Sequence, residues 1–525
     1  MTRSGIALID PSNQPDHPEN DVLDNGECSR PALDVGSDLH ELVDEALRFV
    51  ARDEFLFQTS AELVQLSRDQ DRRLSLRPLK SAQLRYLLAK HIRWVKDDKP
   101  CHPPSAVATC ILESASREHV RPIRAVVPFP VLSPTGALQP TGGYDTPTRT
   151  FCALDAPIEV LPQPTREDAQ RAIVELLDVV QDFPFADDAH RAAWLAALLT
   201  PLSRFAHDGN VPLVLVQANA PRVGKTRLVQ VISEILMGTD APAITQTRSE
   251  DETRKRAMSF LRTARPIVLI DNVLGLFGGA TLNALATSRT FEDRVLGSSK
   301  TMLAENLSTW FITGNNVSLA ADTPERCLHI RLHTEVESPQ LRSGFRYPDL
   351  FTVIRERRVA LLSAALTVLR AYFVAGMPDQ GLPAWGSFES WSRVVRGALV
   401  WAGCSDPAIT REELQASADT ETDVKALLIA GWEELQESQG AAQGFRAAEV
   451  LALMKYSSDQ APTLRAALSE LATAPATVPE PKTLARHLRD AKGRNFRGRI
   501  LRCDPDLKAA HRWRVERVSG DGGAG

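Results

Sequence analysis

The stretch LVLVQANAPRVGKT, residues 213–226, contains the residue types that bind nucleotide phosphates. Four apolar residues predict a buried strand, a turn-forming loop follows, and Gly224-Lys225-Thr226 opens a run with helical apolar spacing. Backbone N–H groups of such a loop surround phosphate oxygens, Lys225 supplies a charge to the β- and γ-phosphates, and the Thr226 hydroxyl can bind Mg²⁺. The pattern therefore predicts a P-loop for ATP and Mg²⁺. Nine consecutive residues form it: Asn219, Ala220, Pro221, Arg222, Val223, Gly224, Lys225, Thr226 and Arg227.

The chain departs from the P-loop pattern at its first glycine, which is Asn219 here. Asparagine is among the few non-glycine residues that tolerate a positive φ. We therefore expect that the loop can still form.

A second apolar run, RPIVLIDN at 265–272, predicts a buried strand that ends at Asp271. A carboxylate at the tip of the strand beside the P-loop is where a water-mediated partner of Mg²⁺ is needed, so Asp271 is predicted to share the metal with Thr226. An aspartate that ends an apolar strand is also common by chance. Asn272 stands where many ATPases carry a catalytic glutamate, and an amide could at most position water. Glu292 and Asp293 are alternative candidates for the base, and nothing in the sequence selects either.

A third predicted strand, STWFITGNN at 308–316, ends in two asparagines. Asn315 or Asn316 at its tip could orient the attacking water or contact the γ-phosphate. Arg326 directly precedes a further apolar strand, and at a subunit edge it could act as an arginine finger on a neighbour's nucleotide. The alternative for Arg326 is an ordinary surface salt bridge.

In this order and spacing, the P-loop, LIDN, FEDRVLG, TGNN and ERCLHIRL resemble the AAA+ ATPase module of replication helicases from phages, plasmids and integrative elements, a group similar to superfamily 3 and primase-associated helicases. The resemblance covers about residues 165–400, with further likeness in RYLLAKHIRWVKDDKPCHPP and WGSFESWSRVVRGALVWAG. It implies a homo-oligomeric ring, a hexamer, with single-stranded DNA in its channel. Glu325 departs from the group, since a second arginine often precedes the finger. No polymerase or primase motif is present, so priming activity is not implied.

The segment RVLGSSKTML, residues 294–303, predicts a β-hairpin because two short apolar runs flank Gly297-Ser298-Ser299-Lys300. In ring helicases of the resembled group, a hairpin at this point lines the central channel. The resemblance therefore implies that Lys300 contacts the DNA backbone. The alternative is a solvent-exposed hairpin with a solubilising lysine.

The last 80 residues predict three helices, AAEVLALMKYS, TLRAALSELAT and EPKTLARHLRDAKGRNF, and a hairpin of RGRILRCD and HRWRVERV, which together describe a winged helix. Between residues 482 and 517, twelve basic and four acidic side chains leave +8 in a chain whose formal net charge is −5. Such a basic patch is the electrostatic footprint of a phosphate-binding surface. We predict duplex DNA contacts from Arg486, Arg489, Lys492, Arg494, Arg497 and Arg499. The alternative is a protein-docking winged helix with a solvated charged face.

The alternation of strands and helices from the P-loop to about residue 375 predicts an α/β fold with a largely parallel sheet. The predicted fold class is a P-loop AAA+ core of this kind with an α+β N-terminal domain and a C-terminal winged helix. The expected parts are a disordered segment at 1–36, the N-terminal domain and Pro-rich linker at 37–164, the ATPase domain at 165–375, a helical subdomain at 376–440, the basic winged helix at 441–518 and a flexible tail at 519–525.

Cysteine usage and hydropathy bear on the compartment. The seven cysteines form no C-x-x-C pair, which fits a reducing cytosol and no zinc site. The Cys/His neighbours, Cys101-His102 and Cys327/His329/His333, are expected to be ordinary core or surface residues. No apolar run reaches 18 residues and MTRSGIALID lacks a signal-peptide core, so we expect a soluble cytoplasmic protein with no membrane contact.

These patterns predict an ATP-dependent DNA helicase or translocase that acts in replication of a mobile element. The alternative is a nucleotide-switched DNA-binding regulatory or defence ATPase without unwinding activity, which Asn272 keeps open. A metabolic P-loop kinase is disfavoured by the TGNN strand, the Arg326 segment and the basic tail. Arg93, Lys96 and Lys99 around Trp94 could also bind single-stranded DNA by charge and stacking, although a solvated helix end with one core tryptophan is the favoured interpretation.

Overall fold

The computed structural model describes most of the chain from Arg30 onward. The described ranges are 30–60, 62–68, 74–113, 118–139, 141–154, 156–247, 249–274, 276–294, 301–315, 317–320, 322–336, 339–456, 461–472, 478–496, 498–505 and 511–517. They divide into two compact units, one from Met1–Ser67 and Arg77–Pro122 and the other from Arg68–Leu76 and Ile123–Gly525. Each unit is described separately below.

The N-terminal unit packs three helices beside short strands around one apolar core. Its elements are β1 (Ala32–Asp34), α1 (Leu39–Val50), β2 (Leu56–Gln58), β3 (Leu63–Arg68), α2 (Ser81–His91), β5 (Arg93–Lys96), β6 (Lys99–Pro100) and α3 (Ser105–Glu113), with β4 (Leu74–Pro78) after β3. The sequence predicts helices at 39–50 and 81–92 from apolar spacing, and α1 and α2 confirm them. It also predicts a strand pair from FLFQ (55–58) and ELVQL (62–66), which is confirmed because β2 and β3 are antiparallel.

Two predictions for this unit are wrong. Residues 30–36 were expected to belong to a disordered segment, but β1 pairs in parallel with β5, and this places Leu33 opposite Trp94 in the core. The segment after α2 is strand β5 and not a helix end. Trp94 is 2% exposed and its ring N–H donates to the Leu88 carbonyl at 3.2 Å, so the tryptophan is a core residue, as favoured. The other residues of the expected disordered segment, 1–29, lie outside the described ranges.

The second unit is built on a five-stranded parallel sheet, which confirms the predicted α/β class. Its strands are β10 (Leu213–Ala218), β11 (Ala243–Thr245), β12 (Ile267–Val273), β16 (Thr309–Asn315) and β18 (Cys327–Leu332). They lie in the order β11-β12-β16-β10-β18, and every neighbouring pair is parallel. The central strands are almost continuously buried, as a sheet covered on both faces requires.

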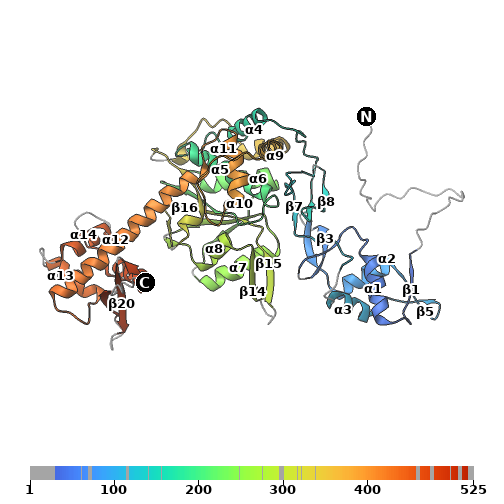
Figure 1. Cartoon of the computed structure of the whole chain (residues 1–525), viewed down its shortest axis with the longest axis horizontal. Helices are drawn as coiled ribbons and strands as arrows, with labels where there is room; N and C mark the ends of the chain where they lie inside the picture. The colour runs from blue at the N-terminus through green and yellow to red at the C-terminus, as the bar shows by residue number, and fades with distance from the viewer. Residues whose placement is uncertain are drawn as a thin grey trace, which may run out of the picture. The chain divides into compact units, whose positions relative to one another are not determined.

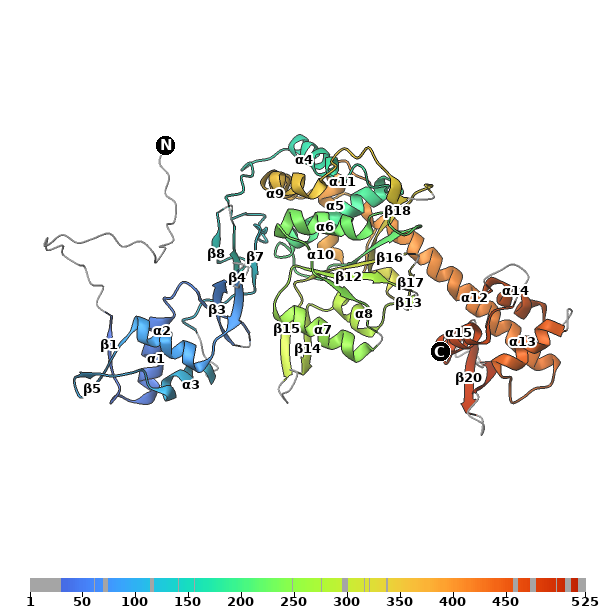
Figure 2. The same cartoon turned by 180° about the vertical axis from the view of Figure 1, so that it is seen from behind.

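Helices cover both faces of this sheet (Figures 1 and 2). One side carries α5 (Asp188–Ser203) and α6 (Lys225–Met237), and the other carries α7 (Glu250–Arg262) and α8 (Ala280–Thr287). The helix α4 (Arg166–Asp178) packs against α9 (Leu350–Val374). The run Thr165-Arg166-Glu167-Asp168 predicts a capping box before α4. This is confirmed, since the Thr165 hydroxyl accepts the Asp168 N–H and the Asp168 carboxylate accepts the Thr165 N–H.

Smaller sheets lie beside the central one. An antiparallel pair, β14 (Thr290–Arg294) and β15 (Thr301–Glu305), confirms the predicted hairpin. Residues 295–300, including Lys300, lie outside the described residues, so the DNA contact predicted for Lys300 stays a prediction. The residues GGYD at 142–145 predict a turn, but Gly143–Asp145 form strand β8, which joins β9 (Thr150–Cys152) and β7 (Ala125–Val127) in one sheet.

The C-terminal part contains the three helices and the hairpin that the sequence predicts. After α10 (Glu389–Trp391), a π-turn (Ser392–Arg396) and α11 (Gly397–Trp401) come α12 (Arg411–Ser438), α13 (Ala447–Tyr456), α14 (Pro462–Glu470), α15 (Pro481–Ala491), β19 (Asn495–Phe496), β20 (Arg499–Pro505) and β21 (His511–Arg517). The predicted start at residue 441 is too late, because Leu428, Ile429 and Trp432 of α12 belong to the same core. Trp432 donates its ring N–H to the Trp513 carbonyl at 2.9 Å, so α12 is an integral helix of this module. The segment 519–525 lies outside the described residues.

Within the described ranges, no helix is both long and apolar enough to cross a bilayer.

A buried carboxylate on α12 ties the terminal hairpin to this helix. Glu433 pairs with Arg517 and Arg499 at 2.7 Å each, and its side chain is 9% exposed. Hydrogen bonds from Arg517, and then from Arg499, lower the pKa of Glu433 although burial opposes them. Because the folded-state pKa is the lower one, ionised Glu433 stabilises the module above its unfolded pKa of about 4.3, and this contribution is lost as pH falls through the folded pKa.

We expect Glu433→Gln to lower the free energy of unfolding of the C-terminal module by about 2 kcal/mol at pH 7, with a smaller loss near pH 4. Hydrogen exchange of β20 and β21 at both pH values measures this difference. The control is Glu437→Gln, because Glu437 is a more exposed partner of Arg517 at 3.5 Å. An equal effect at the two pH values would contradict a role for the ionised carboxylate.

Candidate nucleotide site

The loop between β10 and α6 has a conformation that requires a glycine at its end. Gly224 is the N-cap of α6 with φ of 109°, and a Cβ at this position would lie 3.1 Å from the Phe183 ring. Arg222 also has a positive φ, 63°. The loop therefore turns sharply where its backbone N–H groups meet the N-terminus of α6, which is the arrangement that binds anions.

Asn219 does not act in the expected way. Its φ is not positive, and the left-handed position within the loop is taken by Arg222. The Asn219 side chain instead donates to the Thr334 carbonyl at 2.8 Å and accepts the Thr334 N–H at 3.1 Å. This amide therefore ties the start of the loop to the chain that leaves β18, a role that local sequence does not reveal.

Lys225 and Asn315 meet at the carboxyl edge of the sheet. The strands β10 and β16 are in register with Ala218 opposite Asn315, which brings the start of α6 to the tip of β16. The Lys225 ammonium donates to the Asn315 amide oxygen at 2.5 Å, and the residue as a whole is 8% exposed. Burial lowers the pKa of Lys225, and the Asp271 carboxylate opposes that effect. Because this ammonium is poorly hydrated, it can exchange its hydrogen bond with Asn315 for one with a phosphate oxygen. Asn316, the alternative to Asn315, lies outside the described residues.

Asp271 is the hub of a small hydroxyl–carboxylate cluster. The Thr226 hydroxyl donates to Asp271 Oδ1 at 2.7 Å, and the Thr313 hydroxyl donates to the same atom at 2.5 Å. Hydroxyl and carboxylate oxygens are the donors that Mg²⁺ prefers, so the two residues predicted to hold the metal are brought together. The contact of Thr313 with Asp271 was not predicted. Thr313 stands two residues before Asn315, near the carboxyl end of the same apolar strand.

The backbone conformation at position 272 favours asparagine. It lies on a bulge of β12 between Ile270 and Val273, with φ of 54° and its N–H donating to Thr313 Oγ1 at 2.9 Å. A glutamate would adopt this φ less readily than asparagine. Of the two alternative bases, Asp293 is 8% exposed and pairs with Arg254 of α7 at 3.4 Å, so it serves a structural ion pair.

A cavity of about 210 Å³ opens beside the loop and suits a nucleotide base. Its floor includes Phe183, Arg222 and Gly224, and its far wall includes Phe345 and Tyr347. The far wall is held to α4, since the Tyr347 hydroxyl donates to Asp178 at 2.6 Å and the Arg346 guanidinium lies 2.9 Å from the same carboxylate. No pattern in the sequence predicts this wall. The run of aromatic and basic residues at 342–347 is its only local signal.

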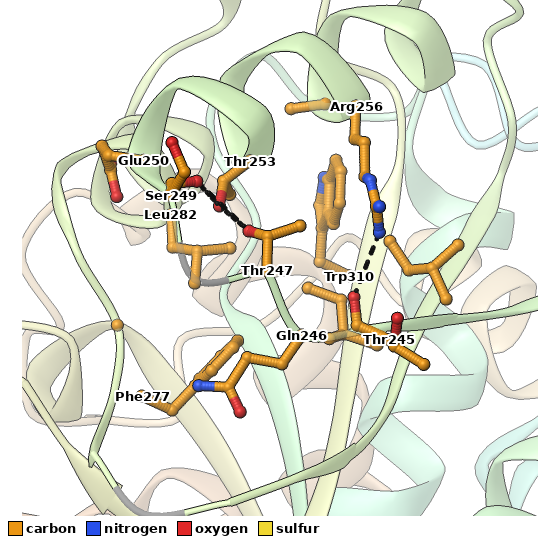
Figure 3. A pocket seen from close by; sticks show the side chains of 14 residues that line it. Thr245, Gln246, Thr247, Ser249, Glu250, Thr253, Arg256, Phe277, Leu282 and Trp310 are labelled. Carbon is orange, nitrogen blue, oxygen red and sulfur yellow. Dashed lines mark hydrogen bonds between the residues drawn. The ribbon is translucent and has the colours of Figure 1, made fainter.

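A second cavity, of about 340 Å³, lies at β11 and is lined by none of the predicted nucleotide residues (Figure 3). Its polar groups already contact one another: the Thr247 and Thr253 hydroxyls are hydrogen bonded, and Arg256 donates to the Thr245 carbonyl at 3.3 Å. Of these two cavities, the smaller one beside the loop is the better candidate for the nucleotide, because its lining includes Gly224 and Arg227.

Arg326 lies at the amino ends of the parallel strands, whereas the loop lies at their carboxyl ends. It ends a 3₁₀ turn (Pro324–Arg326), and the next residue, Cys327, pairs with Leu213 at the beginning of β10. The six residues of β10 separate the two edges by about 20 Å at ~3.3 Å each. Arg326 therefore cannot reach the nucleotide site of its own chain. Its guanidinium makes an ion pair with Asp322 at 3.5 Å.

The basic C-terminal residues divide into two groups. The arginines on the hairpin strands are paired with carboxylates: Arg499 and Arg517 with Glu433, Arg502 with Glu516, Arg512 with Glu449, and Arg514 with Asp504. Arg499 pairs with Glu433 through its Nε, and the DNA contact predicted for Arg499 stays a prediction. Within the described residues, no carboxylate pairs with the exposed cations on α15 and the turn after it, which are Lys482, Arg486, Arg489, Lys492 and Arg494. Arg497 lies outside the described residues.

No model of a known protein family matches the chain, and no curated protein sequence matches it. Among solved structures, the chain is similar to an apo form of the NrS-1 C-terminal region, with 11% identity, 87% of this chain and 95% of that chain covered, and a TM-score of 0.36. It is also similar to the JCV helicase, with 14% identity, 48% and 73% of the two chains covered, and a TM-score of 0.21. Likeness at this level carries no functional weight, so function must be inferred from the residues themselves.

Proposed function

We propose that the chain is an ATP-hydrolysing motor that acts on DNA, with a P-loop AAA+ core and a C-terminal winged helix. One observation carries the proposal: Lys225, Thr226, Asp271 and Asn315 converge within hydrogen-bond distance at the carboxyl edge of the parallel sheet. Ligands of open α/β sheets bind at this edge. The resemblance of the motif string to replication helicases of mobile elements supports DNA as the substrate.

Each group has a role that its chemistry allows. Lys225 exchanges its bond with Asn315 for a phosphate oxygen, while the loop N–H groups hold the adjacent oxygens. Thr226 and Asp271 would hold Mg²⁺, which supplies charge neutralisation when bound. Asn315, released by Lys225, is free to orient the attacking water, and Thr313 keeps the Asp271 carboxylate in place. Phe345 and Tyr347 would contact the base.

Asp271→Ala is expected to remove Mg²⁺-dependent hydrolysis while retaining part of the nucleotide affinity, because the loop and Lys225 stay intact. ATP binding and phosphate release, each measured across a Mg²⁺ titration, distinguish the two effects. Hydrolysis with a normal Mg²⁺ dependence would show that another carboxylate holds the metal.

The active form is proposed to be a homo-oligomeric ring, a hexamer. Arg326 lies on the amino edge of the sheet, too far from its own loop, and a neighbouring subunit is where it could meet a γ-phosphate. Single-stranded DNA would then pass through the ring, with Lys300 of the β14–β15 hairpin as the proposed contact.

Duplex DNA is proposed to bind the exposed face of α15. This helix buries Leu484, Leu488 and Ala491 and leaves Arg486 and Arg489 exposed on its outer side. An exposed basic helix within three helices and a hairpin fits a winged helix that presents α15 to phosphates.

Replacing Arg486, Arg489 and Lys492 together by alanine should weaken duplex binding and lower the slope of log affinity against log salt by about three, one for each lost phosphate contact. The matched control is Arg502→Ala, since Arg502 is paired with Glu516 at 3.0 Å. Salt titrations of DNA binding compare the variants. Equal slopes for the triple variant and the wild type would favour a protein-docking role for α15.

The second candidate function is a nucleotide-switched DNA-binding regulator that does not unwind DNA. The observation that favours it is Asn272, which leaves the tip of β12 without a carboxylate base next to Asp271. Such a protein would bind ATP and oligomerise, with slow hydrolysis that DNA does not stimulate.

A further inference from the structure

A buried pair of histidines faces a glutamate at the edge of the sheet remote from β12. His190 comes from α5, His329 from β18 and Glu413 from the first turn of α12, and one ligand atom from each lies within 4.8 Å of the other two. The residues are distant in sequence and are brought together only by the fold. The expectation of no zinc site, drawn from cysteine spacing, does not address a site of this composition.

One tautomer of His190 suits a metal ligand. Its Nδ1 lies 3.2 Å from both the His329 carbonyl oxygen and the Arg331 backbone nitrogen, and its Nε2 lies 3.7 Å from Glu413 Oε1. The Arg331 N–H donates to Nδ1 when the ring proton is on Nε2. When the proton is on Nδ1, it donates to the His329 carbonyl and the Nε2 lone pair is directed at the carboxylate, which is the tautomer that metal binding would select. Metal-binding histidines are characteristically held by such a bond from the second nitrogen to a backbone carbonyl.

His329 provides the second observation. Its side chain is 3% exposed, and within the described part of the chain neither ring nitrogen has a hydrogen-bond partner of ordinary geometry, although the Thr410 backbone makes a weak contact with the ring. Its Nδ1 lies 3.7 Å from Glu413 Oε2. An unsatisfied ring nitrogen in so dry a place costs about 1–3 kcal/mol unless something binds it. A cation between the three side chains would satisfy this nitrogen and the lone pair of His190 together.

We propose that His190 Nε2, His329 Nδ1 and Glu413 bind a divalent transition metal of the zinc class. Two imidazoles and a carboxylate match the ligand preference of Zn²⁺, with bonds of ~2.0–2.2 Å and a fourth position for water. Side-chain adjustments of roughly 1 Å bring the ligand atoms to tetrahedral spacing. Arg331 donates to Glu413 Oε2 at 3.2 Å and orients the carboxylate from outside. The Glu413 side chain is 41% exposed, which leaves an entry path.

The metal would have a structural task. It would fasten the first turn of α12 to β18 and α5, and the far end of α12 forms part of the C-terminal core. The site shares no residue with the proposed nucleotide site, so it does not depend on the proposed function. The competing occupant is a proton shared between His190 and Glu413.

The test uses the full-length chain, stripped with a chelator and kept free of nucleotide and Mg²⁺. Co²⁺ is titrated as a spectroscopic stand-in, and Zn²⁺ then displaces it. We expect one equivalent with the visible d–d absorption of a low-coordinate nitrogen–oxygen site, and a rise in Tm with Zn²⁺. His329→Gln and Glu413→Gln should each weaken binding at least tenfold. The control His333→Gln, at an exposed histidine just after β18, should bind as the wild type does.

The wild-type titration decides the matter even if one variant fails to fold, which circular dichroism reveals. Absence of a stoichiometric d–d band in the wild type overturns the proposal and leaves the proton as occupant. Undiminished binding by folded His329→Gln also overturns it, because the metal then resides elsewhere. Asp271→Ala separates the proposed Mg²⁺ site, since this variant should keep the Co²⁺ band.

Discussion

Lys225→Ala protein should hydrolyse ATP at least ~10²–10³-fold more slowly than the wild type, with weaker nucleotide binding. Lys225 is 8% exposed and its ammonium touches Asn315, so its charge acts on a phosphate with little screening by water. Alanine removes that charge and leaves the phosphate oxygens with backbone N–H donors alone. Phosphate release at saturating ATP measures the loss, and a fluorescent nucleotide titration measures binding.

The matched control for this change is Lys255→Ala, at an exposed lysine of α7. It removes the same charge from the chain without touching the loop, so its turnover should equal that of the wild type. Turnover by Lys225→Ala close to the wild-type rate would remove the basis for placing the nucleotide at this loop.

Arg326→Ala subunits should bind ATP normally but hydrolyse it about 10³-fold more slowly, because an arginine finger contributes 10³–10⁵ to the rate. Arg326 lies at the amino edge of the sheet, so its effect must cross a subunit interface. Mixing Arg326→Ala with Lys225→Ala subunits creates interfaces where an intact Lys225 faces an intact Arg326. Phosphate release from the mixture should therefore exceed that of either variant alone.

The mixing experiment needs proof that subunits exchange, which light scattering and a tagged subunit provide. Arg262→Ala, at an exposed arginine that ends α7, is the control for loss of a surface cation. No recovery at any mixing ratio in verified mixed oligomers would mean that Arg326 is structural, held to Asp322.

Local patterns predicted the elements and the chemistry that depend on neighbours in the chain. The apolar runs before Asn219 and Asp271 became β10 and β12, and parallel pairing brought their tips together. The helix predicted at 480–496 became α15 at Pro481–Ala491, with its basic residues on the outer side, whereas the predicted helical residues Asn495 and Phe496 form strand β19. In each case, periodicity within about ten residues was sufficient.

What the sequence could not predict depends on partners far along the chain. Asn219 bonds Thr334, 115 residues away, and Arg499 pairs with Glu433, 66 residues away. The residue types alone suggested a positive φ for Asn219 and a DNA contact for Arg499. Only the tertiary structure reveals that the two side chains contact Thr334 and Glu433. The short strand β1 was missed for the same reason, since its polar flanks hide Leu33, which is buried against Trp94.

The base cavity shows a further limit. Phe345 and Tyr347 lie in a segment between β18 and α9 with no regular periodicity. The Asp178 carboxylate of α4 holds this segment through Tyr347 and Arg346, and a local pattern does not encode such a contact. Replacing Tyr347 by phenylalanine would remove the 2.6 Å bond to Asp178 while keeping the ring.

The rate of ATP hydrolysis by the purified wild-type chain, measured with and without single-stranded DNA, tests the proposed motor most directly. A DNA-driven motor couples its nucleotide site to its substrate, so we predict Mg²⁺-dependent hydrolysis that rises several-fold when DNA is added and that Lys225→Ala abolishes in both conditions. ATP binding without hydrolysis, or hydrolysis at the same rate with and without DNA, would contradict the motor and leave the nucleotide-switched regulator as the function.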